Sequence, residues 1–215
     1  SELELEPQPG LNVFIGATAQ GKSNLLEAIA MLGVGKSFRT SRDADTIQSG
    51  CERAVIRGVL HAADAEPVPL ACAIARNPRG ARKSFSRNGR GVPYAAFLGT
   101  LSVVTFVPSD LQLVTGTPTL RRAFLNTALA QQDRGYYRNL ARYQGVLRQK
   151  NTLLRSSPNP DEALLSVYDA TLAESGAALM LARRAFVDAL TLEASAVHAA
   201  WTQEREWLEL RYLPN

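Results

Sequence analysis

Residues Gly16–Ser23 have the sequence GATAQGKS, which matches the phosphate-binding loop pattern G-x-x-x-x-G-K-[ST]. The preceding Leu11–Ile15 is apolar and rich in strand-favouring residues, and the following Asn24–Leu32 has apolar residues at helical spacing. The sequence therefore predicts a strand, a tight loop and a helix in the order that the motif requires. No other feature constrains the fold as strongly, because the loop has to join a strand to the N-terminus of a helix.

Each part of this loop has a defined use in binding a nucleotide. Gly16 and Gly21 permit backbone dihedrals that turn successive N–H groups toward phosphate oxygens, and the helix N-terminus adds partial positive charge. Lys22 can reach the β- and γ-phosphates, and the Ser23 hydroxyl can ligate Mg²⁺. We expect ATP and Mg²⁺ as cofactors, with a glycine-rich turn that binds no ligand as the alternative. The predicted nucleotide-binding residues are Gly16, Ala17, Thr18, Ala19, Gln20, Gly21, Lys22, Ser23 and Asn24.

The charges along the chain are distributed unevenly, although the net charge is only +4. No acidic residue lies between Glu66 and Asp110, and from Asp161 onward acids outnumber bases nine to four. A basic middle favours an anionic polymer as a partner, with a merely solvated basic face as the alternative. The acid-free stretch contains the predicted DNA-binding residues: Arg76, Arg79, Arg82, Lys83, Arg87 and Arg90.

Composition excludes several other classes of protein. The chain has 215 residues, of which 46% are hydrophobic, which excludes a disordered or collagenous protein. No apolar run approaches the length of a membrane span, and the acidic start is not a signal peptide, so we expect a cytoplasmic protein without membrane contact. Cys51 and Cys72 are far apart and His61 and His198 are isolated, so neither a disulfide framework nor a zinc site is expected.

Two regions differ in their secondary-structure pattern. Up to about residue 116 the chain has short, glycine-separated strand patterns, with a hairpin turn predicted at Asn88-Gly89. Beyond it, apolar residues recur at helical spacing, and the final stretch alternates like a strand that returns to a sheet. The predicted strands are 53–61, 68–75, 83–88 and 101–107, and the predicted helices are 119–132, 134–154 and 161–205. The predicted domains are an ATP-binding head over 1–117, a helical arm over 118–206 and a returning strand over 207–215.

The long last helix predicts a projecting arm, with a break near Gly176 as the alternative. In an arm, Leu140, Leu147 and Leu154 would contact the helix that carries Leu172, Leu179 and Phe186. Nucleotide hydrolysis also needs a carboxylate site after an apolar strand, and no convincing one is present. We therefore expect the front part of a composite ATPase, which binds ATP or ADP weakly and hydrolyses neither measurably.

Several longer stretches are more specific than the phosphate loop, and through them the chain resembles the bacterial RecF family of recombination and repair proteins. These stretches are GATAQGKSNLLEAI (16–29), GKSFRT (35–40), Asn88-Gly89, FVPSDLQLVTG (106–116), TPTLRRAFL (117–125) and YRNLARYQGVLRQKNTLL (137–154). The resemblance implies an α/β fold: part of a P-loop ABC-type ATPase head, similar to those of structural-maintenance-of-chromosomes proteins, with an inserted helical arm. The family's signature motif and Walker B carboxylates would lie outside this chain.

The resemblance also implies partners and a role. It implies an ATP-dependent homodimer that binds double-stranded and gapped DNA and promotes RecA loading at single-strand gaps with RecR and RecO. Arg39 and Thr40 would lie in a loop near the nucleotide. The family usually has Asn where this chain has Thr18, Thr where it has Ser23, and Asp where it has Asn126.

Other interpretations remain open from the residues alone. A small-molecule P-loop kinase would use the arginines of 76–90 as a lid, and a nucleotide-gated DNA-binding scaffold would need no hydrolysis. Arg121 and Arg122 could contact DNA, or they could pack locally or pair with Asp110 across the turn at Pro118. Asp110 is predicted as a helix N-cap in preference to a partner of Mg²⁺-bound water. The residues Tyr136, Tyr137 and Tyr143 are predicted to pack in a core in preference to stacking on bases.

Overall fold

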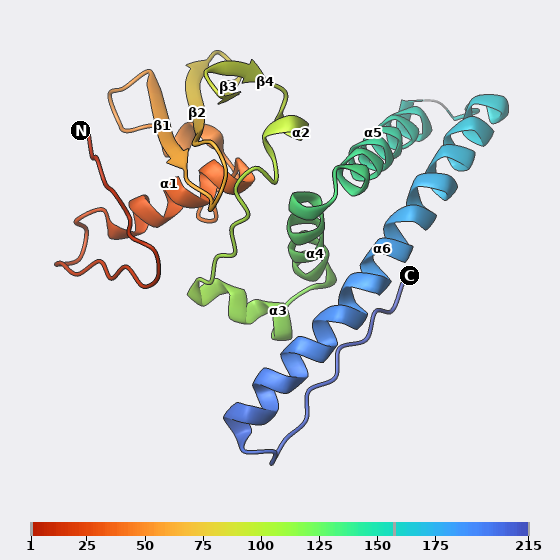
Figure 1. Cartoon of the computed structure of the whole chain (residues 1–215). Helices are drawn as coiled ribbons and strands as arrows, with labels where there is room; N and C mark the ends of the chain where they lie inside the picture. Colours follow the sequence, from red (N-terminus) through yellow and green to blue (C-terminus); the bar gives the residue numbers. More distant parts are fainter. Residues whose placement is uncertain (1, 157, 215) are drawn as a thin grey trace. The chain divides into compact units, whose positions relative to one another are not determined.

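The computed structural model describes residues 2–156 and 158–214, which form two compact units that divide between Val92 and Pro93 (Figure 1). The first unit contains α1 (Lys22–Val34), the 3-10 helix η1 (Asp43–Thr46), β1 (Arg53–Leu60), β2 (Val68–Asn77), β3 (Gly80–Arg87) and β4 (Arg90–Val92). The second contains α2 (Tyr94–Phe97), η2 (Pro108–Leu111), α3 (Gln112–Thr115), α4 (Pro118–Gln132), α5 (Arg134–Ser156) and α6 (Glu162–Thr202). The domain boundaries expected at 117 and 206 stay predictions.

The sheet of the first unit is an antiparallel meander in the order β1-β2-β3-β4. Arg87 pairs with Arg90, so Asn88 and Gly89 form a two-residue turn, and both have positive φ (52° and 72°). This confirms the hairpin predicted there, because two-residue turns of this kind favour Asn-Gly. The predicted strands 53–61, 68–75 and 83–88 correspond to β1, β2 and β3.

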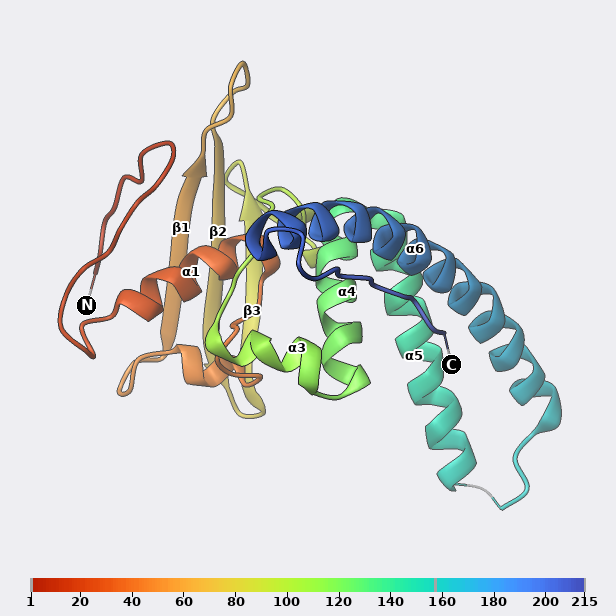
Figure 2. The ribbon, with the colours of Figure 1, turned by 90° about the horizontal axis from the view of Figure 1, so that it is seen from below.

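Helix α1 covers one face of this sheet (Figure 2). Met31 packs with Ile47, Cys72 and Ile74 to form the core of the unit. A Cβ at Gly58 would lie 2.9 Å from the Leu32 side chain, so the small residue lets the helix approach the strand. Burial raises the pKa of Cys72 to about 11, and its thiol is therefore protonated at neutral pH.

The second unit is built on α4, α5 and α6, which pack around Leu98, Leu129, Tyr136 and Leu179. The tyrosines 136, 137 and 143 all pack in or against this core, as predicted. Contacts between α5 and α6 confirm the pairing of the two arm helices, with Leu140 and Phe186 against the core and Leu154, near the end of α5, 47% exposed.

The 41 residues of α6 run without a break through Gly176. A Cβ at Gly176 would lie 3.3 Å from the Tyr143 ring, so this glycine allows close packing against α5. Within the described residues, no helix is both long enough and apolar enough to cross a membrane.

A half-buried polar cluster joins several segments of the second unit. The Arg183 guanidinium on α6 donates to Tyr136 Oη (3.0 Å) on α5 and to Asn126 Oδ1 (2.8 Å) on α4. Tyr136 Oη itself donates to Asn126 Oδ1 at 2.6 Å, and Tyr212 is a further hydrogen-bond partner of Arg183. Within the described part of the chain, Arg183 forms no ion pair.

Three stretches expected to be strands form no strand and pair with none among residues 2–156 and 158–214: 11–15, 101–107 and 207–213. Ile15, Val104 and Trp207 are each more than 90% exposed. These strand predictions were wrong for this structure because an alternating or apolar pattern defines a face but supplies no neighbour for backbone hydrogen bonds.

The extended stretch after α6 lies back along that helix (Figures 1 and 2). Three hydroxyls of α6 hold it, and each donates to a backbone carbonyl oxygen of the stretch. Thr202 donates to Glu206 (3.3 Å), Ser195 to Leu208 (2.6 Å) and Thr191 to Leu210 (3.2 Å). A helix face, and not a sheet, therefore receives this segment.

Candidate nucleotide and nucleic-acid site

The predicted phosphate loop leads directly into α1. Gly21 is the N-cap of the helix with φ 88°, and Ala19 has φ 67°. Positive φ at alternate positions turns successive N–H groups toward the same side, which is the backbone form of an anion-binding nest. A Cβ at Gly16 or Gly21 would meet nothing within 4 Å, so Gly21 is needed for its dihedral angle and not for space.

Lys22 is folded over its own loop. Its Nζ donates to the carbonyl oxygens of Gly16 and Ala17, both at 2.7 Å. An ammonium group has three donors, so one remains for a phosphate oxygen. The side chain therefore already lies at the loop, where the motif requires it.

The start of α1 suits an anion as well. No side chain caps the helix, and its first turn contains no acidic residue. The free N–H groups and the helix dipole therefore have no competing negative partner within this turn. Ser23 is exposed at the same end and is the residue that would ligate a Mg²⁺ ion accompanying a bound nucleotide. The residues present fit a nucleotide.

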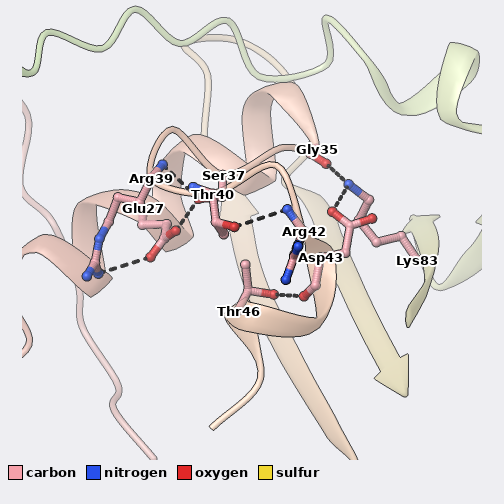
Figure 3. Close-up of polar contacts among 9 residues, drawn as sticks. All are labelled: Glu27, Gly35, Ser37, Arg39, Thr40, Arg42, Asp43, Thr46 and Lys83. Carbon is pink, nitrogen blue, oxygen red and sulfur yellow. Dashed lines mark hydrogen bonds and ion pairs between the residues drawn. The ribbon is translucent and has the colours of Figure 1, made fainter. Parts of the chain in front are cut away.

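The loop after α1 is held by a network of polar contacts (Figure 3). The Ser37 hydroxyl donates to Glu27 and accepts from the backbone N–H groups of Arg39 (2.9 Å) and Thr40 (3.0 Å). The Arg39 guanidinium donates to Asn24 Oδ1 and lies 3.4 Å from Glu27 Oε2. The structure thus brings Arg39 to the first turn of α1, beside the predicted phosphate loop.

Thr40 is turned the other way. Its hydroxyl donates to Asp45 Oδ2 at 2.9 Å and accepts from the Arg42 N–H at 3.0 Å. This hydroxyl therefore fixes the path of the loop into η1, and its role toward a nucleotide stays a prediction.

Lys83, a predicted DNA-binding residue, faces inward. Its Nζ donates to the Gly35 carbonyl oxygen (2.8 Å) and to Asp43 Oδ1 (2.7 Å), and its side chain is only 17% exposed (Figure 3). The residue ties β3 to both ends of the loop described above. We therefore correct this assignment, because an ammonium group so placed is not presented to a DNA backbone.

The other five basic candidates do not form one edge. Arg87 and Arg90 flank the Asn88-Gly89 turn, whereas Arg76 and Arg79 lie at the opposite end of the sheet, and the eight residues of β3 span about 23 Å. The Arg76 Nε also donates to the Cys51 carbonyl oxygen at 3.1 Å. Of these five candidates, only Arg82 lies on the sheet face opposite α1. The stretch 76–90 forms hairpins, so it does not provide the lid of a kinase.

The open sheet face has two further arginines that sequence reasoning missed. Arg53 and Arg82 both pair across the sheet with Ala75, and Arg57 pairs with Ala71, so all three lie on one face among small residues. All three are exposed. The signal was the alternation Arg53, Val55, Arg57, Val59, in which both arginines point away from the core.

The residues after 106 act mainly on local backbone. Asp110 is not an N-cap: it is the third residue of η2, and its carboxylate accepts from the Val107 N–H at 2.9 Å. Arg121 donates to the carbonyl oxygens of Leu113 and Gly116, and Arg122 donates to Thr119. Among the described residues neither arginine pairs with Asp110, and no group of three or more His, Cys, Asp or Glu could hold a metal.

Comparison with known proteins decides the family. The chain is 42% identical over 212 residues to the DNA replication and repair protein RecF of Symbiobacterium thermophilum, covering 98% of this chain. It is 37% and 36% identical to the proteins of the same name from Staphylococcus haemolyticus and Lactococcus lactis, in both cases over the whole chain. The chain belongs to the RecF family. It spans 55–59% of the length of these relatives, and no family model matches it.

Solved structures agree with this assignment. The chain superposes on the recombination mediator protein RecF with ATP with a TM-score of 0.85 and 30% identity, covering 93% of this chain and 53% of that one. A second RecF structure, with ATPrS, gives a TM-score of 0.80 and covers 87% of this chain. Both are described as part of the RecFOR pathway. The predicted fold class, part of an ABC-type ATPase with mixed α/β structure, is confirmed.

Proposed function

We propose that this chain is part of a cytoplasmic, ATP-dependent DNA-binding protein of the RecF type. The protein acts in recombinational repair of single-strand gaps and at stalled replication, and it promotes RecA loading. Mg²⁺ accompanies ATP, RecR and RecO are partners, and the protein forms a homodimer when ATP is bound. Its homology to proteins named for DNA replication and repair supports this role.

The observation that carries the proposal is the phosphate loop. Gly21 caps α1 with positive φ, Lys22 lies over the loop, and the helix start has no acidic partner. RecF structures with ATP and ATPrS share this fold. The same unit carries a sheet face with three exposed arginines, which can neutralise DNA phosphates without reading bases.

The experiment is duplex DNA binding by the full-length protein across a salt series, with ATP, with ADP and without nucleotide. ATP should strengthen binding, and Lys22→Ala should remove that effect. Replacing Arg57 and Arg82 by Ala should weaken binding and lower the salt slope by about two, one for each lost phosphate contact.

A matched double variant tests the face itself. Replacing Arg79 and Arg90 by Ala removes the same charge from the two turns at opposite ends of the sheet, and the slope should then stay close to that of the wild type. The opposite result, with only the turn arginines lowering the slope, would move the DNA contact to the hairpin ends. DNA binding that is indifferent to ATP and to Lys22→Ala would refute ATP dependence.

A further inference from the structure

After α1 the chain reverses and runs back toward the phosphate end of that helix. Gly35 ends the helix with φ 64°, and its N–H bonds to the Met31 carbonyl oxygen. Ser37 then contacts Glu27, and Arg39 contacts Asn24, which lies nearly one turn closer to the start of the helix. The loop thus moves antiparallel to α1 and delivers its arginine to the end that carries Lys22 and Ser23.

The Ser37 hydroxyl is the junction that fixes this path. An ionised carboxylate only accepts hydrogen bonds, so the hydroxyl donates its single hydrogen to Glu27. Its oxygen accepts both the Arg39 N–H and the Thr40 N–H. One side chain therefore orients the backbone of Arg39 and anchors it to α1.

Glu27 and Arg39 differ in how deeply they lie. The Glu27 side chain is 13% exposed, whereas that of Arg39 is 52% exposed, and their closest charged atoms are 3.4 Å apart. This contact is longer than a charge-assisted hydrogen bond. The carboxylate is fixed in place, and the guanidinium rests against it with open donors.

We propose that Glu27 and Ser37 are positioning residues that hold the Arg39 guanidinium at the phosphate end of α1. Neither residue touches the nucleotide: Ser37 sets the backbone and Glu27 anchors Ser37 and restrains the guanidinium. Arg39 turns its free donors to the polyphosphate when a nucleotide binds. The inference rests on the proposed function, because it deepens the same ATP site.

The experiment measures ATP affinity of the full-length protein by calorimetry. Arg39→Ala should weaken ATP binding about tenfold, which is the loss of a charge-assisted hydrogen bond, and Ser37→Ala should weaken it by a similar factor although it removes no charge. Ser37→Thr keeps the hydroxyl and should restore most of the affinity. Ser41→Ala, in the same loop, is the matched control, since the exposed Ser41 hydroxyl makes no hydrogen bond within the described residues.

The double variant Ser37→Ala with Arg39→Ala gives the readout that a merely structural role would not produce. If Ser37 acts through Arg39, the double variant should bind ATP no more weakly than Arg39→Ala alone. Additive losses, or wild-type affinity in Ser37→Ala, would overturn the positioning role. Unchanged ATP binding in Lys22→Ala would instead refute the nucleotide site, and the positioning role would fall with it.

Discussion

Each unit of the chain contains an arginine held by side chains from other segments, and the two are held differently. Arg39 has a carboxylate neighbour, Glu27, and an amide, Asn24, and half of its side chain is exposed. Arg183 has neutral partners, Asn126, Tyr136 and Tyr212, which come from separate segments.

The difference separates two uses of a guanidinium. The Arg39 side chain is half exposed and keeps open donors beside Glu27, so its contacts suit ligand binding. Arg183 donates to Tyr136 Oη on α5 and to Asn126 Oδ1 on α4, and without it the buried Tyr136 oxygen would have no donor, although Tyr136 would still donate to Asn126. The first arrangement should affect affinity and the second stability.

The largest effect is expected for Arg183→Ala, which should lower the free energy of unfolding by about 2 kcal/mol because the buried Tyr136 oxygen loses its donor and Asn126 loses one of its two. Arg39→Ala should change it by less than about 0.5 kcal/mol, as exposed substitutions usually do. Urea denaturation followed by circular dichroism measures both. Arg184→Ala, an exposed neighbour on α6, is the control. If Arg39→Ala and Arg183→Ala lowered the free energy of unfolding equally, the proposed difference between an arginine for binding and an arginine for stability would be wrong.

A smaller effect is expected for Tyr136→Phe, which should cost about 1 kcal/mol at neutral pH through its lost hydrogen bonds. Burial raises the pKa of Tyr136 above its usual value of 10.0, against the opposing hydrogen bond from Arg183. A raised pKa favours the neutral phenol in the folded protein, so its contribution is complete below pH 10.0 and is lost as pH rises through the folded pKa.

Tyr136→Phe should therefore lose less stability than the wild type between pH 9 and 11, as measured by urea denaturation at each pH. Tyr137→Phe, on the same helix, is the matched control for the removal of a phenol hydroxyl. If the free energy of unfolding fell equally with pH in the wild type and in Tyr136→Phe, the Tyr136 pKa would not be raised in the folded protein, and this explanation would be wrong.

The smallest effect is expected for Asn126→Asp, which gives Arg183 a carboxylate partner and so makes its cluster more like that of Arg39. The gain should be about 0.5–1 kcal/mol, because the site is only half-buried. Arg183 should lower the pKa of the new carboxyl, so the gain should be present at neutral pH and vanish as acid protonates it. Thermal melting at pH 7 and pH 3 checks this, and a lower melting temperature at pH 7 would contradict it.

The parts of the fold that sequence predicted are those governed by neighbours in the chain. Asn88-Gly89 specifies its turn locally, and the helices of the arm follow from apolar spacing. The inward position of Lys83 could also have been predicted, since it alternates with Ala81 and Phe85 along β3. Side chains of neighbouring strand residues point to opposite faces, so Lys83 lies on the face covered by α1 and Arg82 on the open one.

Contacts between residues that are distant in the sequence could not be predicted, because they depend on how the chain folds back on itself. Glu27 and Ser37 are ten residues apart, and nothing in either pattern shows that the loop would fold back on α1. Asn126 and Arg183 are joined only once α4 and α6 pack. The stretches 11–15 and 101–107 have strand-like residues, but a pattern cannot show whether a hydrogen-bonding neighbour is present.

The hydroxyls that hold the stretch after α6 have a consequence for how it is released. Thr191 Oγ1 lies 2.7 Å from the Val187 carbonyl oxygen in its own helix, and Thr202 Oγ1 lies 3.0 Å from that of His198. A hydroxyl has one hydrogen, so each of these threonines divides it between the helix carbonyl oxygen, which is the nearer acceptor, and the carbonyl oxygen of the stretch (3.2 Å for Thr191 and 3.3 Å for Thr202). Detachment of the stretch from Thr191 and Thr202 therefore leaves no hydroxyl donor unpaired, so these two contacts oppose detachment less than the Ser195 contact does.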